Sequence, residues 1–321
     1  MIKKECFTAE WIEQVSSELH YNDKNLIEKV IRALSLLEML VKAGCPLVFK
    51  GGTALMLILG KSAHRLSIDI DLICPPGTNI EDYLKSFADF GFINLELVER
   101  KQRDDADIPK SHSKFFYQIA YRNDTDAQSY ILLDVLYEDS HYLRTQQIAI
   151  NCPFIRLEGK PLMVTVPSAE DILGDKLTAF APNTTGIPYY RNGRSCSMEI
   201  AKQLYDVGRL FENVSDLQIT KEAFRKIAVV ELSYRSFGTD IGQVFNDIRQ
   251  TALCISTRGK AGEGDFDLIQ DGIIRVKSFM YKQRYLIDHA IIDAARAAYL
   301  ATLIEKGINE IESYSNNPAD I

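Results

Sequence analysis

Apolar residues near the start of the chain recur at the spacing of an amphipathic helix. Between Leu26 and Val41 they fall every three or four positions, so they share one face of a helix. Thr8 and Asn22 are candidate N-caps, because a short polar side chain there can accept a hydrogen bond from the first helical turn. The pattern therefore predicts helices within residues 8–44.

The following segment changes to the period of a β-strand. Residues 46–49 form a short apolar run, a glycine pair follows, and residues 53–59 are again mostly apolar. From 66 to 73 apolar and polar residues alternate, which is typical of a half-buried strand. We therefore expect a strand, a tight turn, a short helix and a second strand, in that order.

Three further stretches alternate in the manner of strands. They lie at 93–98, 114–121 and 130–137, and a helix is expected before them at 79–90. This order of elements indicates an α+β fold in which helices pack on a mixed or antiparallel sheet.

After residue 166 the pattern is almost wholly helical. Ser168 and Asp171 form a capping-box signature at the start of a helix that is expected to run to about Phe180. A second helix is expected at 197–212, and three or four more between 220 and 311. We therefore expect a sheet-containing part over residues 1–165 and a helical part over residues 166–321.

Composition and charge narrow the class of protein. The chain has 321 residues, of which 46% are hydrophobic, and a formal net charge of −7. Proteins that clamp long nucleic acids usually carry a basic excess, so the charge argues against extended RNA or DNA binding but not against a local basic groove. No apolar run is long enough to cross a membrane, and the N-terminus lacks the apolar run of a signal peptide. A cytoplasmic location is expected.

Two aspartates on the expected strand at 66–73 are the strongest candidates for chemistry. Asp69 and Asp71 are two positions apart, and alternate residues of a strand emerge on the same face. Two carboxylates held side by side repel each other unless a cation lies between them. Mg²⁺, a hard cation that prefers carboxylate and phosphate oxygens, is the expected occupant.

The sequence Gly51-Gly52-Thr53-Ala54-Leu55, followed by Arg65-x-Ser67-x-Asp69-x-Asp71, resembles a known motif. In the nucleotidyltransferase superfamily typified by DNA polymerase beta, a glycine-containing turn precedes an Asp-x-Asp strand. The variant in this chain is most similar to the AbiEii/AbiGii-type nucleotidyltransferase toxins of toxin–antitoxin and phage-defence systems. The resemblance implies a polymerase-beta-like sheet with packed helices in the first half of the chain, a mostly helical second half, and Mg²⁺ and an NTP at the site.

The resemblance also assigns further catalytic residues. The superfamily carries its third carboxylate on a neighbouring strand, and Asp134 within the apolar run 130–137 matches that position. Lys176 matches a lysine that supplies a cation to the nucleotide phosphates. A structural aspartate and an exposed helical lysine are the alternative interpretations of these two residues.

Lys202 and Asp206 lie four residues apart on the next helix and share a face. The family pattern is Lys-Asp-x-x-Asp-Leu, and Gln203 and Val207 depart from it. Asp206 is expected to act as a general base or to orient Lys176. A plain ion pair with Lys202 is the alternative.

The remaining candidates would bind the nucleotide. Backbone amides at a helix start attract anions, and a serine of the same parity as the aspartates points toward the same site. The expected nucleotide-binding residues are Lys50, Gly51, Gly52, Thr53, Arg65, Ser67, Lys176 and Lys202.

The resemblance implies that the chain transfers NMP from an NTP to an acceptor such as a tRNA 3′ end, and that a cognate antitoxin protein exists. Asp69, Asp71 and Asp134 would hold the metal. Transfer to a protein or a small molecule is the first alternative, and the acidic net charge favours it. A catalytically silent nucleotide-binding protein with the same fold is the second.

Overall fold

The computed structural model describes residues 1–97, 110–122, 127–214, 216–235, 238 and 240–311. Within them the chain divides into two compact units. The first comprises Met1–Ile172 and Ile273–Leu286, and the second comprises Leu173–Gly272 and the chain from Ile287 onward. The division therefore lies at 172–173 instead of near 165, and a segment late in the sequence returns to the first unit.

The first unit is built on a five-stranded mixed sheet with strand order β1-β2-β5-β4-β3. The strands are β1 (Val48–Lys50), β2 (Ile70–Cys74), β3 (Asn94–Leu97), β4 (Lys110–Gln118) and β5 (Gln128–Tyr137). β2 and β5 run parallel, and the other neighbours are antiparallel. A second sheet pairs β6 (Thr145–Ala149) with β7 (Met163–Pro167), two strands that the sequence patterns did not predict.

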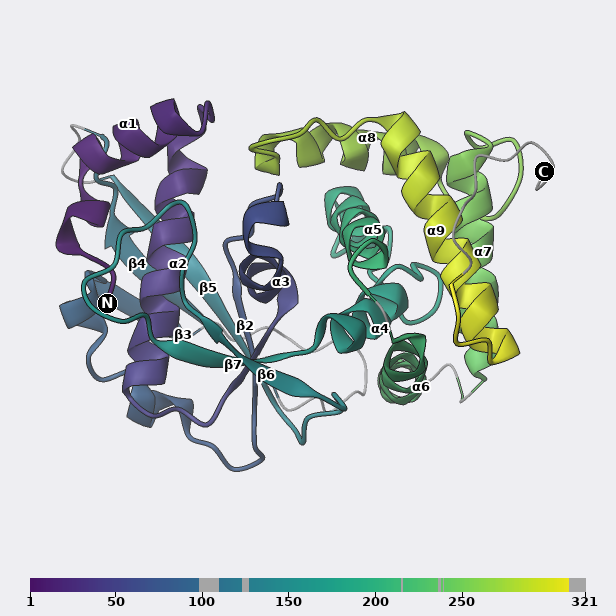
Figure 1. Ribbon diagram of the computed structural model, residues 1–321, viewed down its shortest axis with the longest axis horizontal. Coiled ribbons are helices and arrows are strands. Elements are labelled where there is room, and N and C mark those ends of the chain that lie inside the picture. Colours follow the sequence, from purple (N-terminus) through teal and green to yellow (C-terminus); the bar gives the residue numbers. More distant parts are fainter. Residues whose placement is uncertain (98–109, 123–126, 215, 236–237, 239, 312–321) are drawn as a thin grey trace. The chain divides into compact units, whose positions relative to one another are not determined.

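Helices α1 (Ala9–Glu18) and α2 (Lys24–Lys42) precede the sheet, as predicted, and α2 crosses one face of it (Figure 1). The hydroxyl of Thr8 accepts a hydrogen bond from the backbone N–H of Trp11, and this cap starts α1. The cap of α2 is Asp23 and not Asn22, since the Asp23 carboxylate accepts from the N–H of Leu26. Apolar positions of α2, such as Ile27, Ile31 and Leu34, are fully buried.

Two sequence predictions in the first unit were wrong in detail. The segment expected as one helix at 79–90 forms two short 3-10 turns, Ile80–Tyr83 and Phe87–Phe90. Arg32 and Ser35 of α2 donate to the carbonyl groups of Gly91 and Phe90, so side chains from another element fix the end of the second turn. The strand expected from residue 66 begins only at Ile70.

The second unit is helical in its described residues apart from one short hairpin, Tyr190–Arg191 with Arg194–Ser195. Its helices are α5 (Ser197–Phe211), α6 (Leu217–Tyr234), α7 (Ile241–Ser256) and α9 (Ile287–Lys306), and α9 packs against α5 and α7. Two helices cross the division between the units, α4 (Ala169–Ala179) and α8 (Phe266–Val276). Ser168 caps α4 as predicted, because its Oγ accepts from the N–H of Asp171. The reciprocal bond of a capping box is not formed: the backbone N–H of Ser168 donates to the carbonyl of Arg144, and the Asp171 carboxylate accepts from the hydroxyl of Ser168 instead.

These elements confirm the predicted α+β class, a mixed sheet with packed helices followed by a mostly helical half. None of the described helices has an apolar stretch of the length that a bilayer crossing requires.

Candidate active site

The glycine turn lies directly against the side chains that the sequence motif predicts. Gly51 opens helix α3 (Gly51–Leu59) with a φ of +79°, a conformation that favours glycine. A Cβ atom on Gly51 would lie 2.0 Å from Asp71 Oδ2, and one on Gly52 would lie 2.6 Å from Ser67 Oγ. The two glycines therefore allow the backbone at the helix start to approach groups that a side chain would push away.

The same turn is tied to the residues that follow it. Thr53 is fully buried, and its hydroxyl donates to the backbone carbonyl of Asp69 at 2.7 Å. Arg65 is also buried, and its Nη1 donates to the carbonyl of Leu66 at 2.9 Å. A Cβ on Gly52 would lie 3.0 Å from Arg65 Nη2 as well. Thr53 and Arg65 thus position the segment that carries the aspartates.

A row of charged residues crosses the sheet at one level. Asp71 of β2 is the register partner of Lys50 on β1 and of Asp134 on β5. Asp134 is in turn the partner of His112 on β4. Register partners on neighbouring strands project from the same face of a sheet, so Lys50, Asp71, Asp134 and His112 form a continuous row. The structure therefore brings the second and third predicted carboxylates side by side.

The Asp134 carboxylate has a specific partner in that row. Its Oδ1 lies 2.6 Å from Nδ1 of His112, and both side chains are partly exposed. His112 was not among the sequence candidates, because nothing in the sequence states that the strand 110–118 pairs with β5 in this register. The alternation within the strand was the one available signal, and it places His112 on the polar face.

Asp69 was expected to lie on the same strand as Asp71, but it lies just before that strand, β2. Its side chain is exposed, while Asp71 is half-buried. Lys29 of α2 lies near it: burial lowers the pKa of Lys29, and the negative charge of Asp69 acts in the opposite direction. No sequence pattern indicated Lys29, which occupies one of the less buried positions of an amphipathic helix.

The second unit contains its own charged cluster. Lys176 Nζ on α4 lies 2.9 Å from Asp206 Oδ2 on α5, with side-chain exposures of 8% and 2%. The same ammonium donates to Gln203 Oε1 at 3.0 Å. Gln203 stands where the family pattern has an aspartate, and it still provides an oxygen to the lysine. Asp206 thus contacts Lys176 directly, as expected for a residue that orients it.

Predicted site residues are therefore found in two groups. Those of the first unit are Lys50, Gly51, Gly52, Thr53, Arg65, Ser67, Asp69, Asp71 and Asp134, and those of the second are Lys176, Lys202 and Asp206. Carboxylates and a serine hydroxyl are the oxygen donors that a hard divalent cation prefers, so the donor chemistry of the first group fits Mg²⁺. Over the part of the chain that the structure describes, no three His, Cys, Asp or Glu side chains are arranged as a ready-made metal site.

Solved structures of other proteins match this chain at low sequence identity. The crystal structure of JHP933 from Helicobacter pylori matches with 17% identity and a TM-score of 0.46, over 88% of this chain and 94% of that one. MenT4, a nucleotidyltransferase toxin from Mycobacterium tuberculosis, matches with 15% identity and a TM-score of 0.47, over 92% of this chain and 89% of that one. Among curated proteins, none matches the sequence significantly.

The family model described as "Nucleotidyl transferase AbiEii toxin, Type IV TA system" matches residues 34–295, which include every candidate site residue. This span covers most of the 321 residues. The chain therefore belongs to the AbiEii family of nucleotidyltransferase toxins of type IV toxin–antitoxin systems.

Proposed function

We propose that this nucleotidyltransferase is metal-dependent and transfers NMP from an NTP to an RNA acceptor such as a tRNA 3′ end. The strongest support for the proposal is the register of β2 and β5, which places Asp71 beside Asp134. Family membership implies the NTP substrate and a cognate antitoxin.

Asp69, Asp71 and Asp134 are the residues that would hold Mg²⁺. When bound, the metal supplies charge stabilisation for the attacking and leaving oxygens of a phosphoryl transfer. The Asp71 carboxylate lies close to the glycine turn, and the Asp134 carboxylate is hydrogen-bonded to His112. A preorganised pair of this kind needs little rearrangement when substrate binds.

The backbone amides of Gly51, Gly52 and Thr53 form the N-terminus of α3, and such a terminus attracts phosphate. Ser67 Oγ, close to the Cα of Gly52, would donate to the same phosphate group. We assign the phosphate-binding cations to Lys50, Arg65, Lys176 and Lys202, with Asp206 holding Lys176 in position.

The net charge of −7 favours an alternative to RNA as the acceptor, namely a protein or a small molecule. One labelling experiment distinguishes an RNA acceptor from a protein or small-molecule acceptor. Each labelled NTP is incubated with Mg²⁺, total tRNA and the protein, and label is followed on RNA, on protein and in the small-molecule fraction.

The inactive variant is Asp69→Asn/Asp71→Asn, and the matched control is Asp89→Asn/Asp267→Asn, which removes two exposed carboxylates elsewhere. Label on RNA with wild type and control, and none with the inactive variant, would support the proposal. Label on protein alone would replace RNA by a protein acceptor. Transfer that persists in Asp69→Asn/Asp71→Asn would contradict the assigned site.

A further inference from the structure

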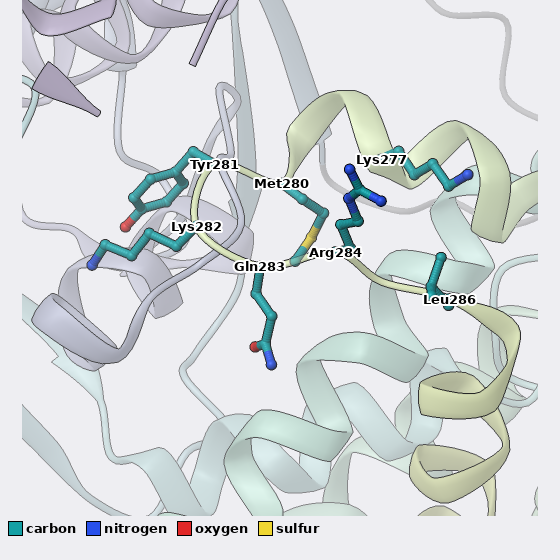
Figure 2. Close-up of a pocket in the computed structure, with 7 residues that line it drawn as sticks. All are labelled: Lys277, Met280, Tyr281, Lys282, Gln283, Arg284 and Leu286. Carbon is teal, nitrogen blue, oxygen red and sulfur yellow. The ribbon is translucent and has the colours of Figure 1, made fainter. Parts of the chain in front are cut away.

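A basic pocket lies in the first unit, and none of the residues that line it is a predicted site residue. It is formed by the segment Lys277–Leu286 and has a volume of about 390 Å³ (Figure 2). Lys277, Lys282 and Arg284 contribute cations to its lining, and Met280 and Leu286 contribute apolar surface. Its seven lining residues include no carboxylate.

The charge of this pocket contrasts with the rest of the chain. The whole protein carries a net charge of −7, yet three of the seven lining residues are cationic, with the Lys282 side chain on the opposite side of the segment from Lys277 (Figure 2). Lys277, Lys282 and Arg284 are all exposed, and none of them forms an ion pair with any residue that the structure describes. Unneutralised cations around one cavity indicate an anionic ligand.

The pocket is fixed to the chain that leads into the aspartate motif. Met280 forms an antiparallel bridge with Arg65, and the N–H of Leu66 donates to the carbonyl of Phe279 at 2.8 Å. On the other side of the bridge, the N–H of Tyr281 donates to the carbonyl of His64 at 3.0 Å.

Side chains strengthen this attachment. Nδ1 of His64 lies 3.0 Å from Gln283 Oε1, and Lys282 Nζ donates to the carbonyl of Lys61 at 2.8 Å. The buried ring of Tyr281 packs edge-on against Phe154, with 5.2 Å between the ring centroids. The pocket is thus part of the same packed unit as Asp69 and Asp71.

The separation along the chain limits the distance to the catalytic carboxylates. Arg65, which is bridged to Met280, is four residues before Asp69, and four residues of extended chain span at most about 14 Å. A ligand in the pocket therefore lies near the predicted site without occupying it.

The chemistry of the lining distinguishes between the two substrates. A triphosphate arrives with a divalent cation that requires carboxylate ligands, and this pocket provides none. A nucleic acid backbone needs separate cations for successive phosphates, and apolar surface for a base or sugar. Three cations match a short single-stranded segment better than a long duplex.

We propose that the pocket formed by Lys277–Leu286 binds the sugar-phosphate backbone of a single-stranded RNA end, next to the hydroxyl that accepts the nucleotide. This inference rests on the proposed function, since it names the surface that holds the acceptor. It also explains how an acidic protein binds RNA: the contact is confined to a few phosphates near the reacting end.

The test measures RNA binding directly, so that it does not depend on transfer. A fluorescein-labelled single-stranded oligoribonucleotide and a labelled tRNA are titrated with wild type and with Lys277→Ala/Lys282→Ala/Arg284→Ala. The matched control, Lys160→Ala/Lys260→Ala/Lys306→Ala, removes three exposed lysines elsewhere and gives the same change in net charge. Binding of NTP with Mg²⁺ is measured in parallel.

We expect the pocket variant to bind both RNAs at least tenfold more weakly at 0.1 M salt, while the control changes less than twofold and NTP binding is unaltered. The slope of log K against log salt should fall in magnitude by about 2, because each lost phosphate contact on a single strand contributes about 0.7.

Three outcomes would overturn the inference. RNA binding by the pocket variant could equal that of wild type, or the variant could lose NTP binding in place of RNA binding. In the third, wild type binds neither RNA yet transfers NMP to another acceptor, which leaves nucleotidyl transfer standing and removes only the RNA pocket. Wild type that binds RNA through the pocket but transfers no NMP would instead contradict the proposed function alone.

Discussion

Asp71 and Asp134 are register partners on the parallel strands β2 and β5, although 63 residues separate them in the sequence. Their carboxylates project from one face of the sheet, between Lys50 on β1 and His112 on β4. Like charges held this close oppose each other, and the lysine on one flank and the hydrogen bond from His112 to Asp134 on the other reduce that cost. The two neighbouring negative charges favour binding of a divalent cation, and the hydrogen bond from His112 holds the Asp134 carboxylate in place.

The glycine turn provides a sharp test of this geometry. In Gly51→Ala the new methyl group would overlap Asp71 Oδ2, and the φ of +79° would be strained. A displacement of about 1 Å at a reacting centre lowers rates by about 100-fold, so transfer should fall by at least that factor. Steady-state transfer kinetics measure this directly.

Gly44→Ala is the matched control. Gly44 has a similar φ of +76°, but a Cβ there meets nothing within 4 Å. This variant should show a stability loss of about 1 to 2 kcal/mol from the backbone conformation and keep its activity. Equal loss of activity in both variants would show that backbone strain, and not contact with Asp71, determines the effect.

The buried pair of Lys176 and Asp206 should contribute to both stability and activity. In Lys176→Met, the buried carboxylate of Asp206 loses the ammonium that lies 2.9 Å from it. The expected cost is about 3 to 5 kcal/mol in the free energy of unfolding, measured by urea denaturation.

The double variant Lys176→Met/Asp206→Leu separates the two roles. Replacing both charges by apolar side chains should restore most of the stability, because no unpaired charge then remains. Transfer should remain lost if Lys176 contacts the nucleotide. Recovery of transfer together with stability would assign the pair a purely structural role.

His112 should act through Asp134. Partners that hold a metal-binding carboxylate typically account for 10–100-fold in metal affinity or activity. His112→Ala should therefore raise the Mg²⁺ concentration for half-maximal transfer by about 10 to 100-fold, as measured by a Mg²⁺ titration. His20→Asn, a change at an exposed histidine, should leave that concentration unchanged.

The buried carboxyl group of Glu28 should make the free energy of unfolding depend on pH. Burial raises the pKa of this carboxyl group, and the nearby Arg32 and the N–H of Ala120 offset that effect only in part. A carboxyl group with a raised pKa in the folded state contributes stability below its unfolded pKa, near 4.3, and loses it as the pH rises through the folded value.

The unfolding free energy of wild type should consequently fall relative to that of Glu28→Gln as the pH is raised from 4 to 8, because only the wild-type side chain ionises. Urea denaturation across that range measures the difference. A wild type that gains stability relative to Glu28→Gln as the pH rises would mean that the ionised form is the one favoured by folding.

Local patterns predicted the elements whose interactions are local. The alternation at 130–137 and the apolar spacing of α2 identified β5 and a core helix, and Ser168 identified the start of α4. The glycine and aspartate motif located the part of the chain that forms the site.

Long-range pairing was beyond the reach of these patterns. The alternation from residue 66 suggested one continuous strand, but Arg65 is bridged to Met280, more than two hundred residues away, and β2 begins only at Ile70. His112 contacts Asp134 through strand register, and a period of two residues does not specify register between distant strands. Among the described strands, β6 and β7 pair with each other and not with the five-stranded sheet, and neither carries a strong alternating pattern.

The return of Ile273–Leu286 to the first unit has a consequence for dissecting the protein. A truncated version ending near residue 172 would keep the five-stranded sheet and all three aspartates, but would expose the backbone that His64 and Leu66 use to pair with Tyr281 and Phe279. Such a fragment would lack part of its own packing, however well its boundary matched the sequence patterns. The helical stretch between Ile172 and Ile273 is an insertion into the first unit along the sequence, so a fragment that isolates the five-stranded sheet has to retain Ile273–Leu286 as well as residues 1–172.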